Sequence, residues 1–145
     1  MNEVKPLLAI TMGDPAGVGP EICLRALHSK KVNDICRPII FGDAETLSRV
    51  GEATNQNTDF QFISLEAFEG MKPDEVERPS IIDFSNVDKA NFQPSTINAK
   101  TGEASYEYIV KAIELAQKGH IQGMATAPIN KYALSLAGID FPGHT

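Results

Sequence analysis

Residues 7–22 constrain the fold of this chain more than any other stretch. They begin with a short apolar run at 7–10, which is typical of a buried strand in a parallel sheet. A Gly-Asp-Pro turn at 13–15 follows, in which glycine tolerates unusual φ values and proline fixes its own. Pro20 suits the first turn of a helix, and Glu21 suits its positive end. The stretch therefore predicts a strand, a tight turn and a helix N-terminus with exposed amides, where α/β proteins bind ligands.

The glycines of this turn match neither common phosphate-binding pattern. They stand at positions 13, 17 and 19, whereas a dinucleotide fingerprint requires Gly-x-Gly-x-x-Gly. No Gly-Lys-Ser/Thr follows, so the stretch is not a P-loop either. Taken alone, the turn is equally well explained as a structural connection between a strand and a helix.

The rest of the chain alternates short apolar runs with segments of helical periodicity. Strands are expected at 38–42, 60–63, 80–84 and 124–126, and helices at 22–27, 44–50, 101–118 and 131–136. Residues 64–79 and 86–98 predict no firm element. The expected apolar stripes are Ile22, Cys23, Ala26 and Leu27 in the first helix, and Tyr106, Ile109, Val110, Ile113 and Ala116 in the longest. This alternation predicts an α/β fold with a largely parallel sheet and helices on both faces.

Length, charge and cysteine content limit the class of protein. The chain has 145 residues, enough for one domain with a real core. Its net charge of -6 argues against a nucleic-acid partner, and no apolar run approaches the ~20 residues of a membrane span. No signal peptide is evident, and Cys23 and Cys36 show no CxxC spacing. We therefore expect a cytoplasmic protein without a membrane partner.

A second candidate site is the sequence Thr-Ala-Pro-Ile-Asn-Lys at 126–131, which follows an expected strand. Thr126 and Asn130 offer a hydroxyl and an amide, and Lys131 offers a positive charge suited to phosphate or carboxylate. Because ligands of open α/β sheets bind at the carboxyl ends of strands, these side chains are candidates for binding. A capped turn with a solvated lysine explains the same residues without any ligand.

The third candidate is the sequence Gly-His-Thr at 143–145. A histidine beside a hydroxyl can bind an anion or transfer a proton, so His144 and Thr145 are candidate site residues. A frayed chain end is the alternative. The three histidines, at 28, 120 and 144, fall at no metal-ligand spacing, so no metal site is expected within these residues.

Four motifs, at 11–21, 102–109, 126–131 and 143–145, occur in the order and spacing of one known family. Together they resemble the 4-hydroxythreonine-4-phosphate dehydrogenase family of pyridoxine biosynthesis. The first loop is also similar to the Gly-Asp-Gly-x-Gly-Pro-Glu turn of isocitrate and isopropylmalate dehydrogenases, whose fold this family shares. The resemblance implies an α/β/α sandwich whose N-terminal domain spans 1–135 and is incomplete without C-terminal segments. Residues 136–145 would begin the second domain.

The resemblance also implies an activity. The family oxidises and decarboxylates a small phosphorylated hydroxy acid, 4-hydroxythreonine 4-phosphate, using NAD or NADP and a divalent metal such as Zn, Mg or Co. The metal-binding histidines of the family lie beyond residue 145. By motif matching, His144 and Thr145 would bind substrate, and Asp14, Thr126, Asn130 and Lys131 would line the cleft. No catalytic residue is assigned, and the family implies a homodimer.

Two alternatives remain open from the residues. D-threonate or D-erythronate 4-phosphate replaces the substrate in some relatives, and nothing in this stretch separates them. A non-catalytic ligand-binding or docking fragment is the other alternative, since the family's metal ligands are not among these residues. On either basis residues 1–145 alone are expected to be inactive and to leave a sheet edge exposed.

Overall fold

The computed structural model describes residues 4–88, 96 and 98–140 of the chain. Five parallel strands form one sheet in the order β3-β4-β2-β1-β5. They are β1 (Leu7–Thr11), β2 (Arg37–Gly42), β3 (Gln61–Ser64), β4 (Ser80–Asp83) and β5 (Gly123–Thr126). All five lie where the sequence predicts strands, to within one residue at each end.

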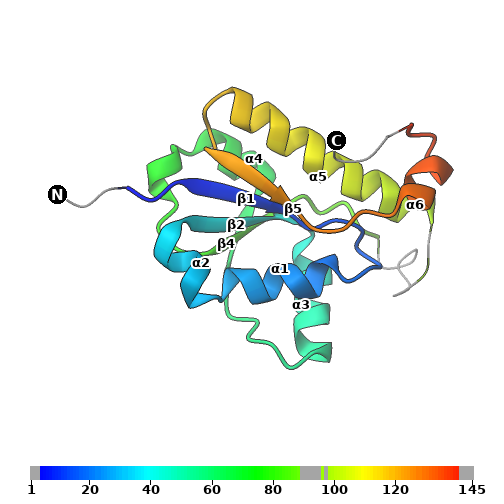
Figure 1. Cartoon of the computed structure of the whole chain (residues 1–145), viewed down its shortest axis with the longest axis horizontal. Coiled ribbons are helices and arrows are strands. Elements are labelled where there is room, and N and C mark those ends of the chain that lie inside the picture. Colours follow the sequence, from blue (N-terminus) through cyan, green and yellow to red (C-terminus); the bar gives the residue numbers. More distant parts are fainter. Residues whose placement is uncertain (1–3, 89–95, 97, 141–145) are drawn as a thin grey trace.

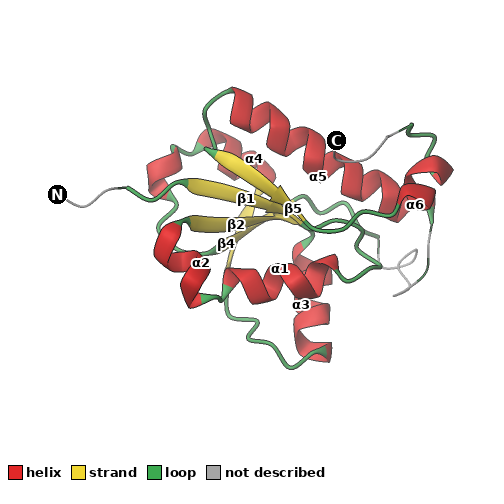
Figure 2. Cartoon of the chain, in the orientation of Figure 1, coloured by secondary structure: helices red, strands yellow, loops and turns green. Residues whose placement is uncertain are grey.

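Helices cover both faces of this sheet, as Figures 1 and 2 show. On one face lie α1 (Gly19–Leu27), α2 (Lys30–Ile35) and α3 (Ala44–Ala53). On the other lie α4 (Leu65–Gly70) and α5 (Ala99–Gln117), and α6 (Lys131–Leu136) packs on the beginning of α5. A 3-10 turn spans Pro73–Glu75. The predicted α/β fold, a parallel sheet between two helical layers, is confirmed.

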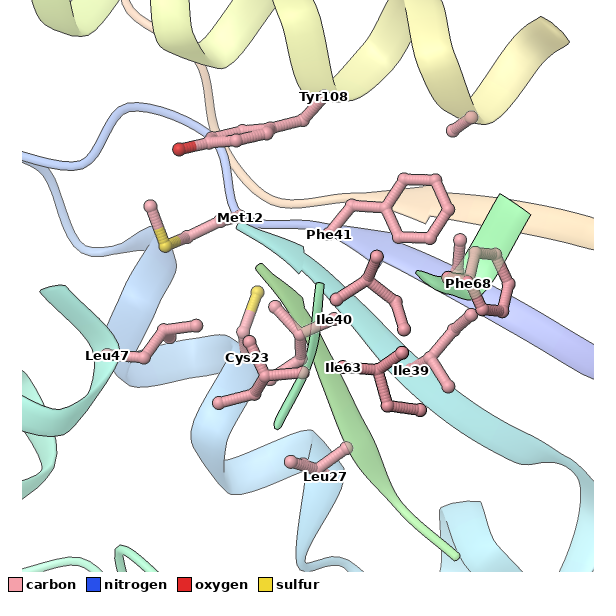
Figure 3. Close-up of a cluster of buried hydrophobic side chains, with 14 of the residues drawn as sticks. Met12, Cys23, Leu27, Ile39, Ile40, Phe41, Leu47, Ile63, Phe68 and Tyr108 are labelled. Atoms are coloured by element: carbon pink, nitrogen blue, oxygen red, sulfur yellow. The ribbon is translucent and has the colours of Figure 1, made fainter. Parts of the chain in front are cut away.

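The core lies on both faces of the sheet around β2, which is buried from Pro38 to Gly42. Figure 3 shows Tyr108 approaching the sheet from α5, on the same side as Phe41, with Cys23 and Leu47 on the opposite side. The ring of Phe84 lies 5.5 Å from that of Phe41 and 5.0 Å from that of Tyr108. These aromatic contacts anchor α5, and the buried apolar side chains on the two faces hold the sheet between its helices.

Two short helices and the ends of α1, α3 and α5 differ from the sequence expectation. The sequence predicts no element at α2 or α4, although both are as long as the expected helix at 131–136. Each begins with a serine that accepts a hydrogen bond from an amide three residues ahead, Ser29 and Ser64 respectively. The third helix was expected to end at Gly51, but it continues to Ala53. A side chain at Gly51 would meet Thr58, so this glycine permits close packing of the following loop and does not end the helix.

The expected apolar stripe of α5 was only partly right. Ile109 is buried as expected, but Tyr108, Ala112 and Leu115 are buried as well, whereas Val110 and Ile113 are 43% and 45% exposed. A pattern based on large apolar residues includes the neighbouring face, because it passes over the small buried residues of this helix. A smaller error of the same kind occurs in α1, where Leu24 is buried and Ile22 is 46% exposed.

The two edges of the sheet are open within the described residues. β5 pairs only with β1, and its last two residues, Ala125 and Thr126, are exposed. Within the part of the chain that the structure describes, no helix has the length and apolarity needed to cross a membrane.

Candidate functional site

The candidate site lies at the carboxyl ends of β1 and β5, which are neighbours in the sheet. The connection after β1 leads to α1 on one face, and the connection after β5 leads to α6, which packs on α5 on the other face. Two adjacent strands whose connections leave toward opposite faces create a crevice at the sheet edge. The sequence motifs at 11–21 and 126–131 therefore meet at the position where open α/β sheets bind ligands.

The loops of the two motifs pack backbone against backbone. The amide of Asp14 donates to the carbonyl of Pro128 at 3.3 Å, and the amide of Ala127 donates to the carbonyl of Thr11 at 2.9 Å. Gly13 has φ +75°, and a side chain there would collide with the Pro128 carbonyl. A side chain at Gly19 would collide with the Met12 carbonyl. The glycines are thus required by a turn and by close approach of two loops.

Asp14 is the unusual polar residue of this region, because only 5% of its surface is exposed. Its Oδ1 accepts a hydrogen bond from the Ala16 amide at 2.8 Å. Its Oδ2 is buried and has no hydrogen-bond partner. The Thr101 side chain, in the first turn of α5, donates its hydroxyl proton to the Asn98 carbonyl at 3.1 Å and also lies close enough to lower the pKa of Asp14. Burial outweighs both contacts and raises the pKa of this carboxyl above its ordinary value of 3.8.

A cavity of about 750 Å³ opens beside this carboxylate. Its walls come from residues 14–18 and Glu21 on one side and from 128–130 on another. The C-terminal half of α3 forms a third wall, and Thr96 completes the lining. Most of the lining is apolar, with a few polar groups at its margin. Clefts of this size and character are typical of small-molecule sites.

The structure brings two of the six expected site residues together in this cavity, Asp14 and Asn130. Asn130 also begins α6, because its Oδ1 accepts a hydrogen bond from the Ala133 amide at 2.9 Å. Thr126 and Lys131 are exposed nearby and do not line the cavity. His144 and Thr145 lie outside the described residues, so their expected role in substrate binding stays a prediction.

The α3 wall of the cavity was missed by the sequence reasoning. It comprises Arg49, Val50, Ala53 and Thr54. The sequence holds no separate signal for it, because Val50 lies three residues from Leu47 and packs against the same core. Among residues 4–88, 96 and 98–140, no three His, Cys, Asp or Glu side chains gather closely enough to hold a metal ion.

A parallel sheet with a ligand-sized cavity at its strand switch point defines a doubly wound α/β ligand-binding domain. A narrower assignment comes from comparison with known proteins. The family model described as pyridoxal phosphate biosynthetic protein PdxA matches residues 34–145, and the chain belongs to this family.

Individual relatives match almost the whole chain. A 4-hydroxythreonine-4-phosphate dehydrogenase of Trichlorobacter lovleyi is 37% identical over 145 residues, which are 100% of this chain and 43% of the relative. A protein of Symbiobacterium thermophilum, provisionally named D-threonate 4-phosphate dehydrogenase, is 38% identical over 99% of this chain and 42% of its own length. The crystal structure of a 4-hydroxythreonine-4-phosphate dehydrogenase from Burkholderia phymatum superimposes with a TM-score of 0.84 at 34% identity, covering 98% of this chain and 42% of the other. The chain therefore spans less than half the length of these relatives.

Proposed function

We propose that this chain supplies the N-terminal domain of an NAD- or NADP-dependent dehydrogenase that oxidises and decarboxylates 4-hydroxythreonine 4-phosphate. The observation that carries the proposal is the ligand-sized cavity beside the buried Asp14 at the β1/β5 switch point. Relatives named for this activity match 98% or more of this chain at 34% to 37% identity. D-threonate 4-phosphate is the second candidate substrate, since a relative of equal similarity carries that name.

The residues present fit a dinucleotide and do not fit a metal. The cavity has apolar walls and one buried carboxylate oxygen without a donor, which suits a large organic cofactor that bears hydroxyl groups. NAD(P) would supply the hydride acceptor for the oxidation. Since the described residues offer no metal-ligand cluster, the proposed metal would depend on residues outside them, and we derive no step through it.

The chain's own residues contribute binding and orientation. Asp14 would accept a hydrogen bond from the ligand in the cavity, while Lys131 is an exposed positive charge beside it. A lysine in this position would attract the phosphate of a substrate at the mouth of the cleft. His144 and Thr145 would bind the same anion from the following segment.

The homodimer expected from the resemblance and the cytoplasmic location expected from the cysteine content belong to the same proposal. The open edge of β5 and the exposed Val110 and Ile113 on α5 are surfaces that further polypeptide would cover. Free thiols at Cys23 and Cys36 support a reducing compartment.

The test is turnover by the protein expressed from its full reading frame. With NAD or NADP and a divalent cation, oxidation of 4-hydroxythreonine 4-phosphate should appear as reduced-cofactor absorbance with release of CO2. D-threonate 4-phosphate should be measured in parallel to assign the substrate by kcat/KM. Turnover of neither compound, despite binding of the phosphorylated ligand, would overturn the enzyme proposal in favour of the non-catalytic alternative.

A matched pair of variants tests the unassigned substrate residues. His144→Gln should raise KM for the phosphorylated substrate by ~10-fold or more, because a hydrogen bond to a charged group is lost. His28→Gln is the control, since His28 is exposed at the far end of α1, where it contacts the Asn57 carbonyl. Equal kinetics for the two variants would remove His144 from the proposed site.

A further inference from the structure

We infer that a second cavity, at the amino ends of the strands, binds the oxyanion of a small anionic molecule, a phosphate or a carboxylate group. Its volume is about 420 Å³, and residues 4–6, Arg37, residues 73–74 and Gln122 line it. The length of β1, ~13 Å at a rise of ~3.3 Å per residue, separates this cavity from the candidate site. The inference does not depend on the proposed function.

The first observation is the way in which Arg37 is held. Its Nε donates a hydrogen bond to the Lys5 carbonyl at 3.0 Å. Its Nη1 donates to the carbonyls of Pro73 and Val76 at 2.8 and 3.0 Å. These bonds fix the plane of the guanidinium and use the donors of Nε and Nη1. Among the described residues, the N–H groups of Nη2 have no acceptor, so they remain for a ligand in the cavity.

Lys5 and Gln122 are held in a similar way. The Lys5 ammonium donates to the Asn33 carbonyl at 2.6 Å, which leaves its other N–H groups for a further acceptor. The Gln122 Oε1 accepts a hydrogen bond from the Leu7 amide at 2.7 Å, so the NH2 group of this side chain turns away from β1. Side chains from three separate segments therefore offer N–H donors to one cavity, and backbone groups anchor each of them. Anchored donors lose little conformational entropy when an anion binds.

The second observation is the charge and composition of the lining. Two cations, Lys5 and Arg37, stand against one carboxylate, Asp74, although the whole chain has a net charge of -6. A positive cavity on an acidic protein concentrates small anions at that place. Val4 and Pro6 add apolar surface, so the ligand has room for a small organic body beside its oxyanion.

The experiment follows trace acylation of Lys5 by mass spectrometry in the protein from its full reading frame. Inorganic phosphate and malonate are the probes, and sodium chloride at equal ionic strength is the reference. A bound oxyanion should slow the acylation of Lys5 in a saturable manner, with half of the effect at ~1 to 10 mM, since exposed charges pair weakly. The probe with the lower half-effect concentration identifies the group as phosphate or carboxylate.

Lys30 is the control within the same samples. Its side chain is 88% exposed, pairs with Asp34 and does not line the cavity, so its acylation should not respond to either probe. Because the measurement is local to Lys5, an anion bound near Lys131 at the candidate site does not contribute to it.

Two variants of nearly unchanged shape should move the half-effect concentration in opposite directions. Gln122→Glu keeps the acceptor for the Leu7 amide, but it replaces the NH2 donor with an oxygen and adds a negative charge. The half-effect concentration should therefore rise ~10-fold or more. Asp74→Asn removes the one carboxylate of the lining and should lower that concentration ~2- to 5-fold.

Three results would overturn the inference. The first is acylation of Lys5 that neither probe slows. The second is equal slowing of Lys5 and Lys30, or equal slowing by chloride, because general screening would then explain the effect. The third is a half-effect concentration in Gln122→Glu equal to that of the wild type, since the anion would then not contact the side chains that line the cavity.

Discussion

The two helices that begin at the candidate site do so in opposite ways. At α6, Asn130 is extended and its side chain accepts a hydrogen bond from the Ala133 amide. At α1, the preceding residue Val18 has helical dihedrals and offers no side-chain cap. The two starts are joined by the hydrogen bond from the Asp14 amide to the Pro128 carbonyl. The N-terminus of α6 therefore has a side-chain cap. The N-terminus of α1 has none and lies beside the cavity.

This difference separates the two loops by how their helices begin. Side-chain caps also begin the other described α-helices, through Ser29, Asp43, Ser64 and Asn98. The first turn of α1 therefore lacks the side-chain cap that begins each of these other helices. The same region holds a buried carboxylate with an unpartnered oxygen. The loop after β5 contributes a cavity wall and caps its own helix, whereas the loop after β1 leaves the first turn of α1 without a side-chain acceptor.

The largest expected effect comes from pushing the two loops apart. In Gly19→Ala, the new methyl group would collide with the Met12 carbonyl and approach the Ala127 side chain. Because both neighbours belong to the packed loops, we expect a loss of about 3 kcal/mol in the free energy of unfolding. Denaturant unfolding followed by circular dichroism measures this change.

Gly70→Ala provides the control for that substitution. Gly70 ends α4, its φ is not positive, and a side chain there would have nothing within 4 Å. This variant should match the wild type or gain up to ~1 kcal/mol through lower entropy of the unfolded chain. If Gly19→Ala is equally harmless, the two loops are not held as closely as described.

The sequence was sufficient for most of the fold and for placing the loops after β1 and β5 at the same end of the sheet. The apolar runs predict all five strands because buried parallel strands leave an unmistakable local pattern. The burial of Asp14 is different, because Pro128 and the first turn of α5 enclose it and both are remote in the sequence. No local pattern reports such an enclosure. The cavity wall on α3 was missed for the same reason.

The face of α5 shows a second limit. Its expected stripe and its buried stripe both repeat at helical spacing, so periodicity alone could not choose between them. Small residues decided the outcome, since a side chain at Gly102 would collide with the Ala133 carbonyl of α6. Close packing of this kind is set by the partner helix, which the sequence of α5 does not contain.

The next prediction concerns the side-chain cap of α6. Asn130→Ala removes the acceptor for the Ala133 amide and should cost about 1 kcal/mol, as cap losses typically do. Since α6 has only six residues, the loss should appear as faster hydrogen exchange of its amides, with little change at β1. Protection of α6 equal to that of the wild type would show that packing on α5, rather than the cap, holds the helix.

Asp14→Asn tests how the loop after β1 affects the pH dependence of folding stability. Burial raises the pKa of Asp14 in the folded protein above its unfolded value, so the folded state binds more protons as the pH falls toward 3.8. This residue therefore favours folding below its folded pKa, and that contribution is lost as the pH rises through the window above 3.8. Without ligand, Asp14→Asn should not lose stability in this way as the pH rises. At pH 7 it should melt at a temperature equal to or higher than that of the wild type. Thermal melts of both proteins from pH 4 to pH 7, a range chosen to span the ordinary Asp pKa, measure the difference. A variant that melts at a clearly lower temperature at pH 7 would mean that the carboxylate stabilises the fold.

The smallest effect is expected at Val18, which precedes α1 and makes no side-chain cap. Val18 is 59% exposed and makes no capping contact, so Val18→Ala should change the free energy of unfolding by less than ~0.5 kcal/mol. Val18→Ser should give the same result, because the helical dihedrals of this residue keep a serine hydroxyl from reaching the amides ahead. Denaturant unfolding of the two variants side by side tests this directly. A gain of ~1 kcal/mol for serine over alanine would show that the start of α1 accepts an ordinary cap, and the contrast with α6 would then lie in the residue chosen rather than in the geometry of the loop.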